Sequence, residues 1–527
     1  MPGGRFLGGR ELKFPPPVFS ALRCRPHAIV FLAATVVHLN GCDQRRSAKE
    51  DLSLHSFAIT VPERAAEEKI SPALRAALAN LEVSERVRVL VTLASQLDLN
   101  RVGVALAERE LTRKERRELV VAALGKVASS EQGELSRFLA QLRSRGVIGE
   151  YRAFTIVNRM MVEGTPGAVR AIATRSEVAS IDPETDEIVD GEAMSSRLAL
   201  APATRKSWGI AAIGADSLWK LGLDGTGTVV GIIDPGVSAS HEQLRENFRG
   251  GSASWLDPSG VRDSPTDEAP GHGTSVLSTA VGANVRGVSV GVAPRAKWVA
   301  CGAFVGARYN NIRLTQCAEW MLATAQPDVL VLPWLLPGGP GCDTSLHRIV
   351  SALRAAEIFL VFAAGNQGPG SGSNRSPANY VRLFPGEGVS FAVGGITERG
   401  TSYPTSSRGA NRCDAASTFP RIAAPAAEIP AAIPLTPSTY LQTRGTSVAA
   451  GFAAGAVALL RQRHPEATIM EIELALLEGA RDAGEPGPDP IFGYGRLDLP
   501  SALEVLSRLR GGNNDKTKSP PTNAAHR

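Results

Sequence analysis

The feature that most constrains this fold is an unbroken run of small and apolar residues near the C-terminal end, residues 445–460. It reads Gly-Thr-Ser-Val-Ala-Ala-Gly-Phe-Ala-Ala-Gly-Ala-Val-Ala-Leu-Leu, and no charged side chain interrupts it. A helix that is apolar on every side has no face to present to water, so other elements must enclose it. We therefore expect a buried helix over residues 452–460, with Ser447 at its N-terminal end.

Ser447 occupies a favourable place for a nucleophile. The positive end of a helix dipole stabilises an attacking alkoxide and a developing oxyanion, and small neighbours leave room for a substrate carbonyl. The same Gly-Thr-Ser pattern also begins ordinary helices as an N-cap. The stretch alone does not decide between the two interpretations.

Residues 207–509 alternate apolar strand patterns with helix patterns. Continuous apolar strands that alternate with helices indicate a parallel sheet covered by helices on both faces. The expected fold class is therefore α/β. The predicted strands are residues 228–234, 298–303, 329–332, 359–363 and 390–394, and the predicted helices are residues 275–283, 311–325 and 346–356.

A smaller α+β pattern precedes this region and ends in an exposed tail, residues 186–206. The basic run at residues 113–117 falls within a predicted helix, and we interpret it as a solvated face. Because no aromatic residues interleave with the run, it does not indicate nucleic-acid binding. The predicted strands are residues 87–93, 155–162 and 178–182, and the predicted helices are residues 101–110, 113–142 and 168–174.

The N-terminal segment has the features of an export signal. Basic residues precede an apolar run, residues 28–37, which is too short to span a bilayer but suits a signal-peptide core. The run ends in Leu-Asn-Gly-Cys, which resembles a bacterial lipobox and predicts that Cys42 is lipidated. The alternative is an ordinary secretory signal that is cleaved nearby. Both interpretations predict an exported protein, either a cell-envelope lipoprotein or a secreted one.

Composition and cysteine usage agree with an exported globular chain. The 527 residues are too many for one compact core, and 43% hydrophobic with 21% charged residues is typical of folded, water-exposed proteins. After Cys24 and Cys42 in the leader, four cysteines remain. They permit two disulfides in three connectivities, or free thiols, and their spacing fits no zinc site. They are Cys301, Cys317, Cys342 and Cys413.

Three further motifs supply partners for Ser447. Asp234 ends an apolar strand, and catalytic groups on parallel sheets gather at the carboxyl ends of strands. His272 lies between two glycines at a helix start, and Asn366 follows another strand end. A serine hydroxyl reacts only when a histidine takes its proton, a carboxylate orients that histidine, and an amide can donate to the oxyanion. Each motif alone is weak, but all four together predict a serine hydrolase.

On these motifs, residues 208–509 resemble a subtilisin-like serine peptidase of the subtilase family. The resemblance implies Asp234 as orienter, His272 as general base and acid, Ser447 as nucleophile and Asn366 in the oxyanion hole. The matching stretches are residues 232–237, 271–276, 291–294, 364–366, 445–449 and 493–498.

The resemblance also implies an organisation for the whole chain. The α+β region looks like a subtilase propeptide, which acts as an intramolecular inhibitor; the alternative is an unrelated exported domain. The expected parts are a signal peptide at residues 1–42, a linker at 43–72, a propeptide-like domain at 73–195, a peptidase domain at 196–510 and a disordered tail at 511–527.

The sequence departs from the family pattern at several places. Pro235 follows Asp234 where the family has Thr or Ser, and Gly451 replaces a proline. Gln243 replaces an aspartate that often ligates calcium, so the usual calcium site is not supported. No cofactor is predicted, with calcium at another site as the alternative. The largest departure is at residues 333–337, where Pro-Trp-Leu-Leu-Pro replaces a Ser-Leu-Gly strand that pairs with the substrate.

Pro333, Trp334 and Leu335 are therefore predicted to shape substrate binding. The leading hypothesis is an exported endopeptidase that acts on peptide or protein substrates and cuts off its own propeptide within residues 194–207. A narrow processing peptidase would share the same catalytic residues. The alternative from another class is a catalytically impaired, subtilase-shaped protein that binds peptides or acts as a scaffold.

Overall fold

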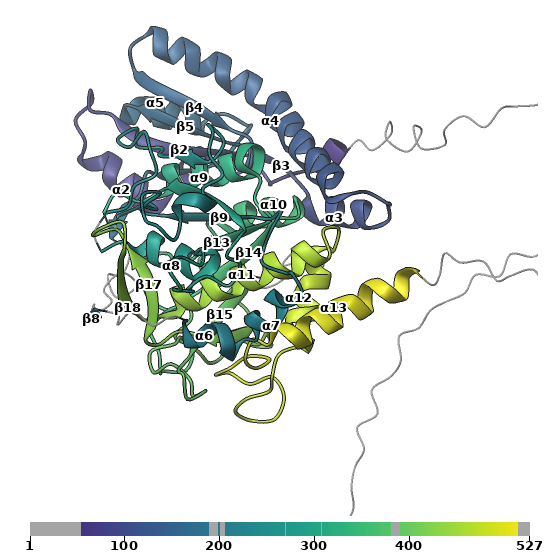
Figure 1. Ribbon diagram of the computed structural model, residues 1–527. Helices are drawn as coiled ribbons and strands as arrows, with labels where there is room; N and C mark the ends of the chain where they lie inside the picture. Colours follow the sequence, from purple (N-terminus) through teal and green to yellow (C-terminus); the bar gives the residue numbers. More distant parts are fainter. Residues whose placement is uncertain are drawn as a thin grey trace, which may run out of the picture. The chain divides into compact units, whose positions relative to one another are not determined.

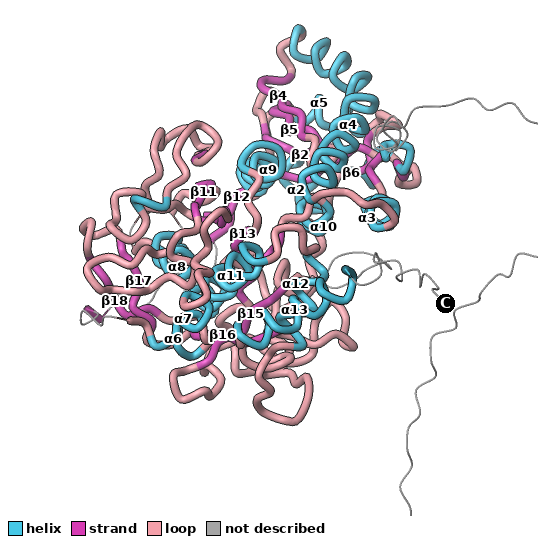
Figure 2. The backbone as a smooth tube through the Cα atoms, turned by 45° about the vertical axis from the view of Figure 1, so that its right-hand side comes forward, coloured by secondary structure: helices cyan, strands magenta, loops and turns pink. Residues whose placement is uncertain are grey.

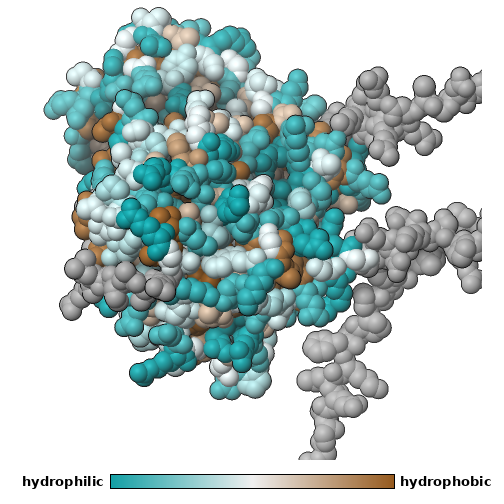
Figure 3. All heavy atoms as spheres, viewed as in Figure 1, coloured by the Kyte–Doolittle hydropathy of each residue, from teal (hydrophilic) through white to brown (hydrophobic). Residues whose placement is uncertain are grey.

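A computed structural model describes residues 54–188, 199–200, 206–268, 270–306, 308–380 and 390–514 (Figure 1). The predicted signal peptide, Cys42 and most of the predicted self-cleavage segment lie outside these ranges. Among the helices of the described ranges, none combines the length and the apolar character needed to cross a bilayer. The face in Figure 3 is mainly hydrophilic, with apolar side chains in small groups.

The predicted α/β fold is confirmed. Within the described ranges seven strands form one sheet in the order β10-β11-β9-β13-β14-β15-β16, and every neighbouring pair is parallel. Because β9 has later strands on both sides, its carboxyl end lies at a switch point of the sheet, where open α/β sheets bind ligands. The strands are β9 Val229–Asp234, β10 Trp255–Leu256, β11 Lys297–Gly302, β13 Val329–Leu332, β14 Phe359–Ala363, β15 Phe391–Ile396 and β16 Ile422–Pro425.

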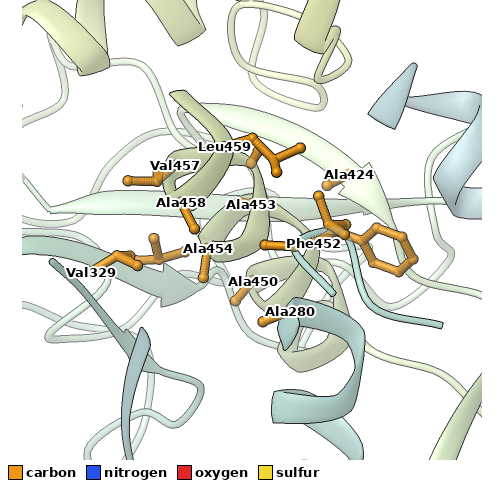
Figure 4. Close-up of a cluster of buried hydrophobic side chains, with 14 of the residues drawn as sticks. Ala280, Val329, Ala424, Ala450, Phe452, Ala453, Ala454, Val457, Ala458 and Leu459 are labelled. Atoms are coloured by element: carbon orange, nitrogen blue, oxygen red, sulfur yellow. The ribbon is translucent and has the colours of Figure 1, made fainter. Parts of the chain in front are cut away.

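The apolar run forms α11 (Thr446–Arg463), a helix that is buried from Thr446 through Arg461. Figure 4 shows its side chains packed against strands of the sheet and against α8 (His272–Val281). At Gly451 a Cβ would lie 2.6 Å from the carbonyl oxygen of Val276, so only glycine lets α8 approach this closely. The absence of the family's proline at this position is therefore matched by tight packing of the two helices.

Helices cover both faces of the sheet. Val329 and Val331 of β13 lie in the core that α11 and α8 complete, whereas the alternate residues face the other side. On that other side a disulfide joins Cys301 of β11 to Cys317 of α9 (Asn311–Trp320). A second disulfide joins Cys342 to Cys413, so the structure selects one of the three connectivities that the sequence allowed. The helix α10 (His347–Ala355) contacts β14.

The N-terminal domain is a four-stranded antiparallel sheet, in the order β4-β5-β2-β6, with a long helix α4 (Arg113–Ser144) against it (Figure 2). Thr112 and Glu115 form a capping box that fixes where α4 begins. The strands are β2 Val87–Leu93, β4 Ile148–Phe154, β5 Arg159–Gly164 and β6 Val178–Pro183, and the other helices are α2 Pro72–Asn80, α3 Leu99–Ala107 and α5 Pro166–Ala173.

Three predictions about chain organisation are wrong in part. The segment predicted as a linker belongs to the N-terminal domain from Leu54 onward, where it forms η1 (Leu54–Phe57), β1 (Ala58–Thr60) and α1 (Ala66–Lys69). Its few apolar residues are anchors: Leu54 is 2% exposed and Ile70 is 1% exposed. The predicted exposed tail begins with a strand, β7 (Asp186–Ile188).

The predicted disordered C-terminal segment also begins with structure, because α13 (Leu499–Asn514) continues four residues into it. The sequence pattern did not predict β4, because this strand has few apolar residues and is buried only at its two ends, Ile148 and Phe154. The remaining elements are β3 Ser95–Leu97, β8 Ala199–Leu200, β12 Arg308–Asn310, β17 Ile429–Ile433, β18 Thr439–Thr443, α6 Trp208–Ala212, α7 Ala215–Trp219, α12 Ile469–Glu478, η3 Arg245–Asn247 and the π-helical turn η4 Met321–Ala325.

Candidate active site

Asp234 and His272 meet at the switch point of the sheet. Asp234 is the last residue of β9 and is 2% exposed, and His272 is the first residue of α8. The imidazole Nδ1 lies 2.9 Å from both carboxylate oxygens. Burial raises the pKa of Asp234, and the charge of His272 offsets only part of that increase. The carboxylate therefore has a strong preference for a cationic or N–H neighbour.

The Asp234 contact fixes the tautomer of His272. Because Nδ1 faces the carboxylate, it carries the proton, and Nε2 is left as the lone-pair nitrogen. Among the described residues Nε2 is buried and has no hydrogen-bond partner. Burial lowers the pKa of His272, but the nearby Asp234 and Asp267 raise it more, so the pKa ends above its usual value. A basic, unpartnered nitrogen is what a general base requires.

Asp267 is a carboxylate near this pair that the sequence interpretation missed. One of its oxygens accepts hydrogen bonds from the backbone N–H of Thr274 at 2.8 Å and from its hydroxyl at 2.6 Å. Burial raises the pKa of Asp267 to about 7. The contact holds the first turn of α8 and so positions His272. The available signal was an acidic residue five positions before the glycine-flanked histidine.

Arg262 is a second missed residue, and it holds the chain just beyond Asp234. Its guanidinium donates to the carbonyl of Pro235 and forms an ion pair with the buried carboxylate of Asp257, at 2.7 Å. Pro235 has no N–H with which to make backbone contacts of its own. The arginine therefore provides an anchor at a position where the family's Thr or Ser is missing.

Ser447 is the second residue of α11 and is 5% exposed. Its hydroxyl donates to the carbonyl of Pro333 at 3.1 Å, and no hydrogen bond among the described residues joins it to His272. The two helices that carry these residues pack together, since the hydroxyl of Thr279 in α8 donates to the carbonyl of Val448. The described rotamer thus directs the serine toward the segment at residue 333.

Asn366 is held so that its amide nitrogen is the free end. Its side-chain oxygen accepts from the backbone N–H of Thr446 at 3.0 Å and from the Thr446 hydroxyl at 3.2 Å. The Thr446 hydroxyl also accepts from the N–H of Gly365. With the oxygen fixed, the NH₂ group is directed away from Thr446 and can donate to another acceptor. Thr446 is therefore a positioning residue that the sequence interpretation had left unassigned.

A pocket opens beside Ser447 and Asn366. Among the described residues that line it, Arg375 is the charged one; the others are Pro333, Trp334, Leu335, Leu336, Ala363, Gly365, Gln367 and Thr446. Residues 333–336 thus border Ser447 and Asn366, and β13 ends before them at Leu332. Within this lining Leu335 packs close to Gly365, because its Cδ1 lies 2.6 Å from the place that a Cβ on Gly365 would take.

Trp334 borders the pocket, but most of its side chain is buried inside the protein. The side chain is 4% exposed, and its indole N–H donates to the carbonyl of Ile233 at 2.8 Å. The ring also packs edge-on against Phe304, with 5.5 Å between ring centres. Trp334 therefore fastens the segment to β9, next to Asp234.

The residues around Gln243 supply few charged oxygens at the place where the family often binds calcium. The Gln243 amide nitrogen donates to the carbonyl of Val288 at 3.2 Å, whereas its amide oxygen is buried and has no hydrogen-bond partner among the described residues. The adjacent loop brings Arg286 to within 3.6 Å of the Glu242 carboxylate. No group of three or more acidic, histidine or cysteine side chains in the described ranges could hold a metal ion. Hard cations need charged oxygen ligands for tight binding.

Comparison with known proteins places this geometry in a family. The profile of the Subtilase family matches residues 225–495. Subtilisin DY of Bacillus licheniformis is 30% identical over 301 residues, which cover 56% of this chain and 98% of that protein. Subtilisin Savinase of Lederbergia lenta is 29% identical over 298 residues, covering 56% of this chain and 97% of that protein.

A third relative extends the similarity into the N-terminal domain. Bacillopeptidase F of Bacillus subtilis (strain 168) is 30% identical over 440 residues, which cover 76% of this chain. The chain spans 29% of the length of that relative.

Proposed function

This chain belongs to the subtilase family of serine peptidases, and on that premise we propose that it is an exported endopeptidase that hydrolyses peptides or proteins. The observation that carries the proposal is the buried Asp234–His272 pair, which leaves one imidazole nitrogen without a partner. A serine becomes nucleophilic only when such a base can accept its proton. Ser447 lies at the start of the helix packed against α8 and is the nucleophile in this proposal.

In the proposed reaction the Ser447 hydroxyl exchanges its bond to the Pro333 carbonyl for one to His272 Nε2. The oxygen attacks the substrate carbonyl carbon while Nε2 takes the proton, and Asp234 stabilises the imidazolium that forms. The imidazolium then protonates the departing amine as the peptide C–N bond breaks, which leaves an ester on Ser447. Water, activated by the same nitrogen, hydrolyses that ester and restores the hydroxyl.

The oxyanion of each tetrahedral intermediate accepts hydrogen bonds from the Asn366 amide and from a backbone N–H at the start of α11. Support comes from the contacts that fix the Asn366 oxygen on Thr446, because they leave the donor end preorganised. Preorganised donors need not rotate as charge develops, which makes them more effective than water.

Substrate selection is assigned to Pro333, Trp334 and Leu335. A subtilase substrate pairs with the cleft wall as an added strand, but a proline cannot donate a main-chain hydrogen bond. The burial of Trp334 and the close approach of Leu335 to Gly365 support a restricted pocket. We therefore expect a selective or slow enzyme rather than a broad digestive one.

The N-terminal domain is assigned the role of an inhibitory propeptide. Support comes from β7, which leaves this domain and pairs antiparallel with β12 of the peptidase domain. The adjoining residues are also bonded across the two domains, since the side-chain amide of Asn310 donates to Glu184 at 2.7 Å. Strand addition is the way in which extended peptides bind to exposed sheet edges. The chain is proposed to cut itself within residues 194–207.

Cys42, which lies outside the described residues, is proposed to carry lipid and to tether the enzyme to a membrane. Two acyl signals are needed for stable anchoring, and a diacylated cysteine supplies them. In a Cys42→Ser variant we expect the protein to leave the membrane fraction. Unchanged partitioning would exclude the tether and favour an ordinary secretory signal.

The alternative function is a subtilase-shaped protein that binds peptides without hydrolysing them. The hydrogen bond from Ser447 to Pro333, in place of one to His272, is the observation in its favour. A fluorophosphonate probe separates the two functions, because only an activated serine forms the covalent adduct. We expect labelling of the wild type and of the exposed-serine control Ser345→Ala, and none of Ser447→Ala. Absence of labelling in the wild type, after removal of the N-terminal domain, would favour the binding protein.

Self-processing has its own test. The Ser447→Ala chain should accumulate as the full-length precursor, whereas the wild type and Ser345→Ala should yield two fragments. Normal processing of Ser447→Ala would mean that another protease cuts the chain.

A further inference from the structure

The basic run that the sequence predicted to be solvated is instead an interface, and that prediction is wrong. Arg113, Arg116 and Arg117, here called the arginine turn, begin α4 and contact the peptidase domain. The side chain of Arg113 is 12% exposed and that of Arg116 is 18% exposed, whereas their neighbour Lys114 is 85% exposed. Three of the four basic residues in the run are therefore turned toward the second domain.

Two of these arginines form ion pairs with carboxylates at the amino ends of the parallel strands. Arg113 pairs with Asp328, the residue before β13, at 2.8 Å. Arg116 lies 3.4 Å from Glu357, which precedes β14. Asp328, Glu357 and Glu466 are here called the acidic edge.

Arg117 acts on the ends of two helices. Its three nitrogens donate to the carbonyls of Ala356, which follows α10, and of Gln326 and Pro327, which follow η4, at 2.9–3.2 Å. Carbonyls at a helix C-terminus lack intrahelical partners and carry the negative end of the dipole. One planar guanidinium satisfies all three carbonyls with a rigid fork of donors, a geometry that the compact ammonium of a lysine does not reproduce.

The capping is reciprocal between the two domains. Glu466 of the peptidase domain accepts the backbone N–H of Arg113 at 2.9 Å, where α4 has its own unpaired donors and positive dipole end. Each domain therefore completes helix ends of the other. The acidic edge also acts on the buried Arg461. Burial and the proximity of Arg113 lower the pKa of Arg461 to about 9, and Asp328 and Glu357 offset part of that decrease.

We propose that the arginine turn and the acidic edge form a second docking site, which keeps the N-terminal domain bound to the peptidase domain after the chain between them has been cut. This inference rests on the proposed role of the N-terminal domain as a removable propeptide. The strand pair β7–β12 joins the domains elsewhere, through other residues. Because each contact holds the other at a high effective concentration, loss of one does not release the domain. Release of the inhibitor then requires the arginine contacts to break as well.

The test uses a Ser447→Ala full-length chain with a recognition sequence for a second, site-specific protease within residues 189–198. After that protease has cut the chain, the two halves are diluted and separated by gel filtration at 0.05 M and at 1 M NaCl. The higher concentration screens charge contacts more strongly, because the Debye length is about 3 Å at 1 M. We expect the halves to elute together at low salt. Replacing Arg113 and Arg117 by alanine should raise the dissociation constant at least ~30-fold, the effect of truncating one buried charge pair.

Three further variants define the contact. Lys114→Ala, in the same turn, should leave the dissociation constant unchanged. Arg117→Lys keeps the charge but loses the contact with three carbonyls. Its dissociation constant should therefore lie between that of the wild type and that of the double-alanine variant, and the substitution should leave the fold intact. The combination of Arg113→Ala with Asp328→Asn should reduce the binding free energy of the two halves by less than the sum of the two single changes, because the two residues contact each other.

The proposal is overturned if the double-alanine halves stay together as tightly as those of Lys114→Ala, with native near-UV circular dichroism in both. This outcome is independent of catalysis, because the cut is made by another protease in a chain without the Ser447 hydroxyl. Failure of the wild type to process itself would refute the zymogen instead.

Discussion

The two ends of the same parallel sheet differ in how their buried polar groups are bonded. At the carboxyl end, Asp234 is buried with His272, and the imidazole keeps one nitrogen without a partner. At the amino end, Asp328 has a partner at each oxygen, since Arg113 binds one and the N–H of Val229 binds the other. The first arrangement leaves an imidazole nitrogen available for a reaction, whereas the second bonds both oxygens of a carboxylate and so helps to hold two domains together.

This difference shows how burial acts on similar carboxylates. A buried group with few partners has a shifted pKa and can exchange a proton, so it suits catalysis. A carboxylate with saturated hydrogen bonds contributes mainly binding and positioning. Substitutions at the two ends should therefore separate turnover from domain docking.

The largest expected effect is that of Asp234→Asn. The change removes the carboxylate that holds His272 in its reactive tautomer, so kcat/KM for a peptide substrate should fall by about 10⁴. The matched control is Asp328→Asn at the other end of the sheet, which should change kcat/KM by less than tenfold while weakening docking. Equal losses in both variants would show that the two ends do not differ in function.

Asn366→Ala should lower kcat by roughly 10²–10³ with little change in KM, because the lost donor acts mainly on the oxyanion. The control Thr446→Ser retains the hydroxyl that positions the amide and should retain most of the activity. If Asn366→Ala changed KM alone, the amide would be a ground-state substrate contact.

The combined change Pro333→Ser and Leu335→Gly should broaden specificity. It restores a backbone donor and opens the pocket beside Gly365, and each regained hydrogen bond strengthens substrate binding by about 0.5–1.5 kcal/mol, roughly tenfold at most. Cleavage profiles of a peptide library measure the effect. A wild-type profile that is already broad and fast would contradict a restricted cleft.

The pH dependence sharpens the role of the carboxyl end. His272 must be neutral to accept a proton, and its pKa is raised, so activity should appear only as the pH rises past a midpoint above the usual 6.5. Asp267 contributes to that increase. Asp267→Asn keeps an acceptor for Thr274 but removes the charge, so the midpoint of kcat/KM should move to lower pH. A midpoint that does not move would assign Asp267 a purely structural role.

The smallest expected effect is that of a chelator. Because Gln243 is neutral and the nearby Glu242 carboxylate lies 3.6 Å from Arg286, few charged oxygens are left near the usual family site, and EDTA should leave the melting temperature unchanged. A matched measurement with added CaCl₂ should also show no stabilisation. A marked drop with EDTA would reveal a calcium site in this chain.

Local patterns were sufficient for several elements of the fold. The predicted strands at residues 87–93, 329–332 and 359–363 have the bounds of β2, β13 and β14, because apolar runs between turn residues are local signals. The four motifs around Asp234, His272, Asn366 and Ser447 were also readable, since each is a short stretch at a strand or helix end. Their catalytic roles stay predictions until the variants are measured.

What the sequence by itself determined was the α/β fold, the family resemblance and the motifs that bring a carboxylate, an imidazole and a hydroxyl to one edge of the sheet. Only the tertiary structure decided the cysteine pairing, the inward position of Trp334, the anchors in residues 54–72 and the docking of the arginine turn. The physical reason is that periodicity reports which side of an element is apolar, whereas a partner in another part of the chain leaves no local trace, whether it is 16 residues away, as for Cys301 and Cys317, or 239, as for Arg117 and Ala356. A guanidinium in water and one that caps two helices have the same sequence neighbours, and only the packed fold distinguishes them.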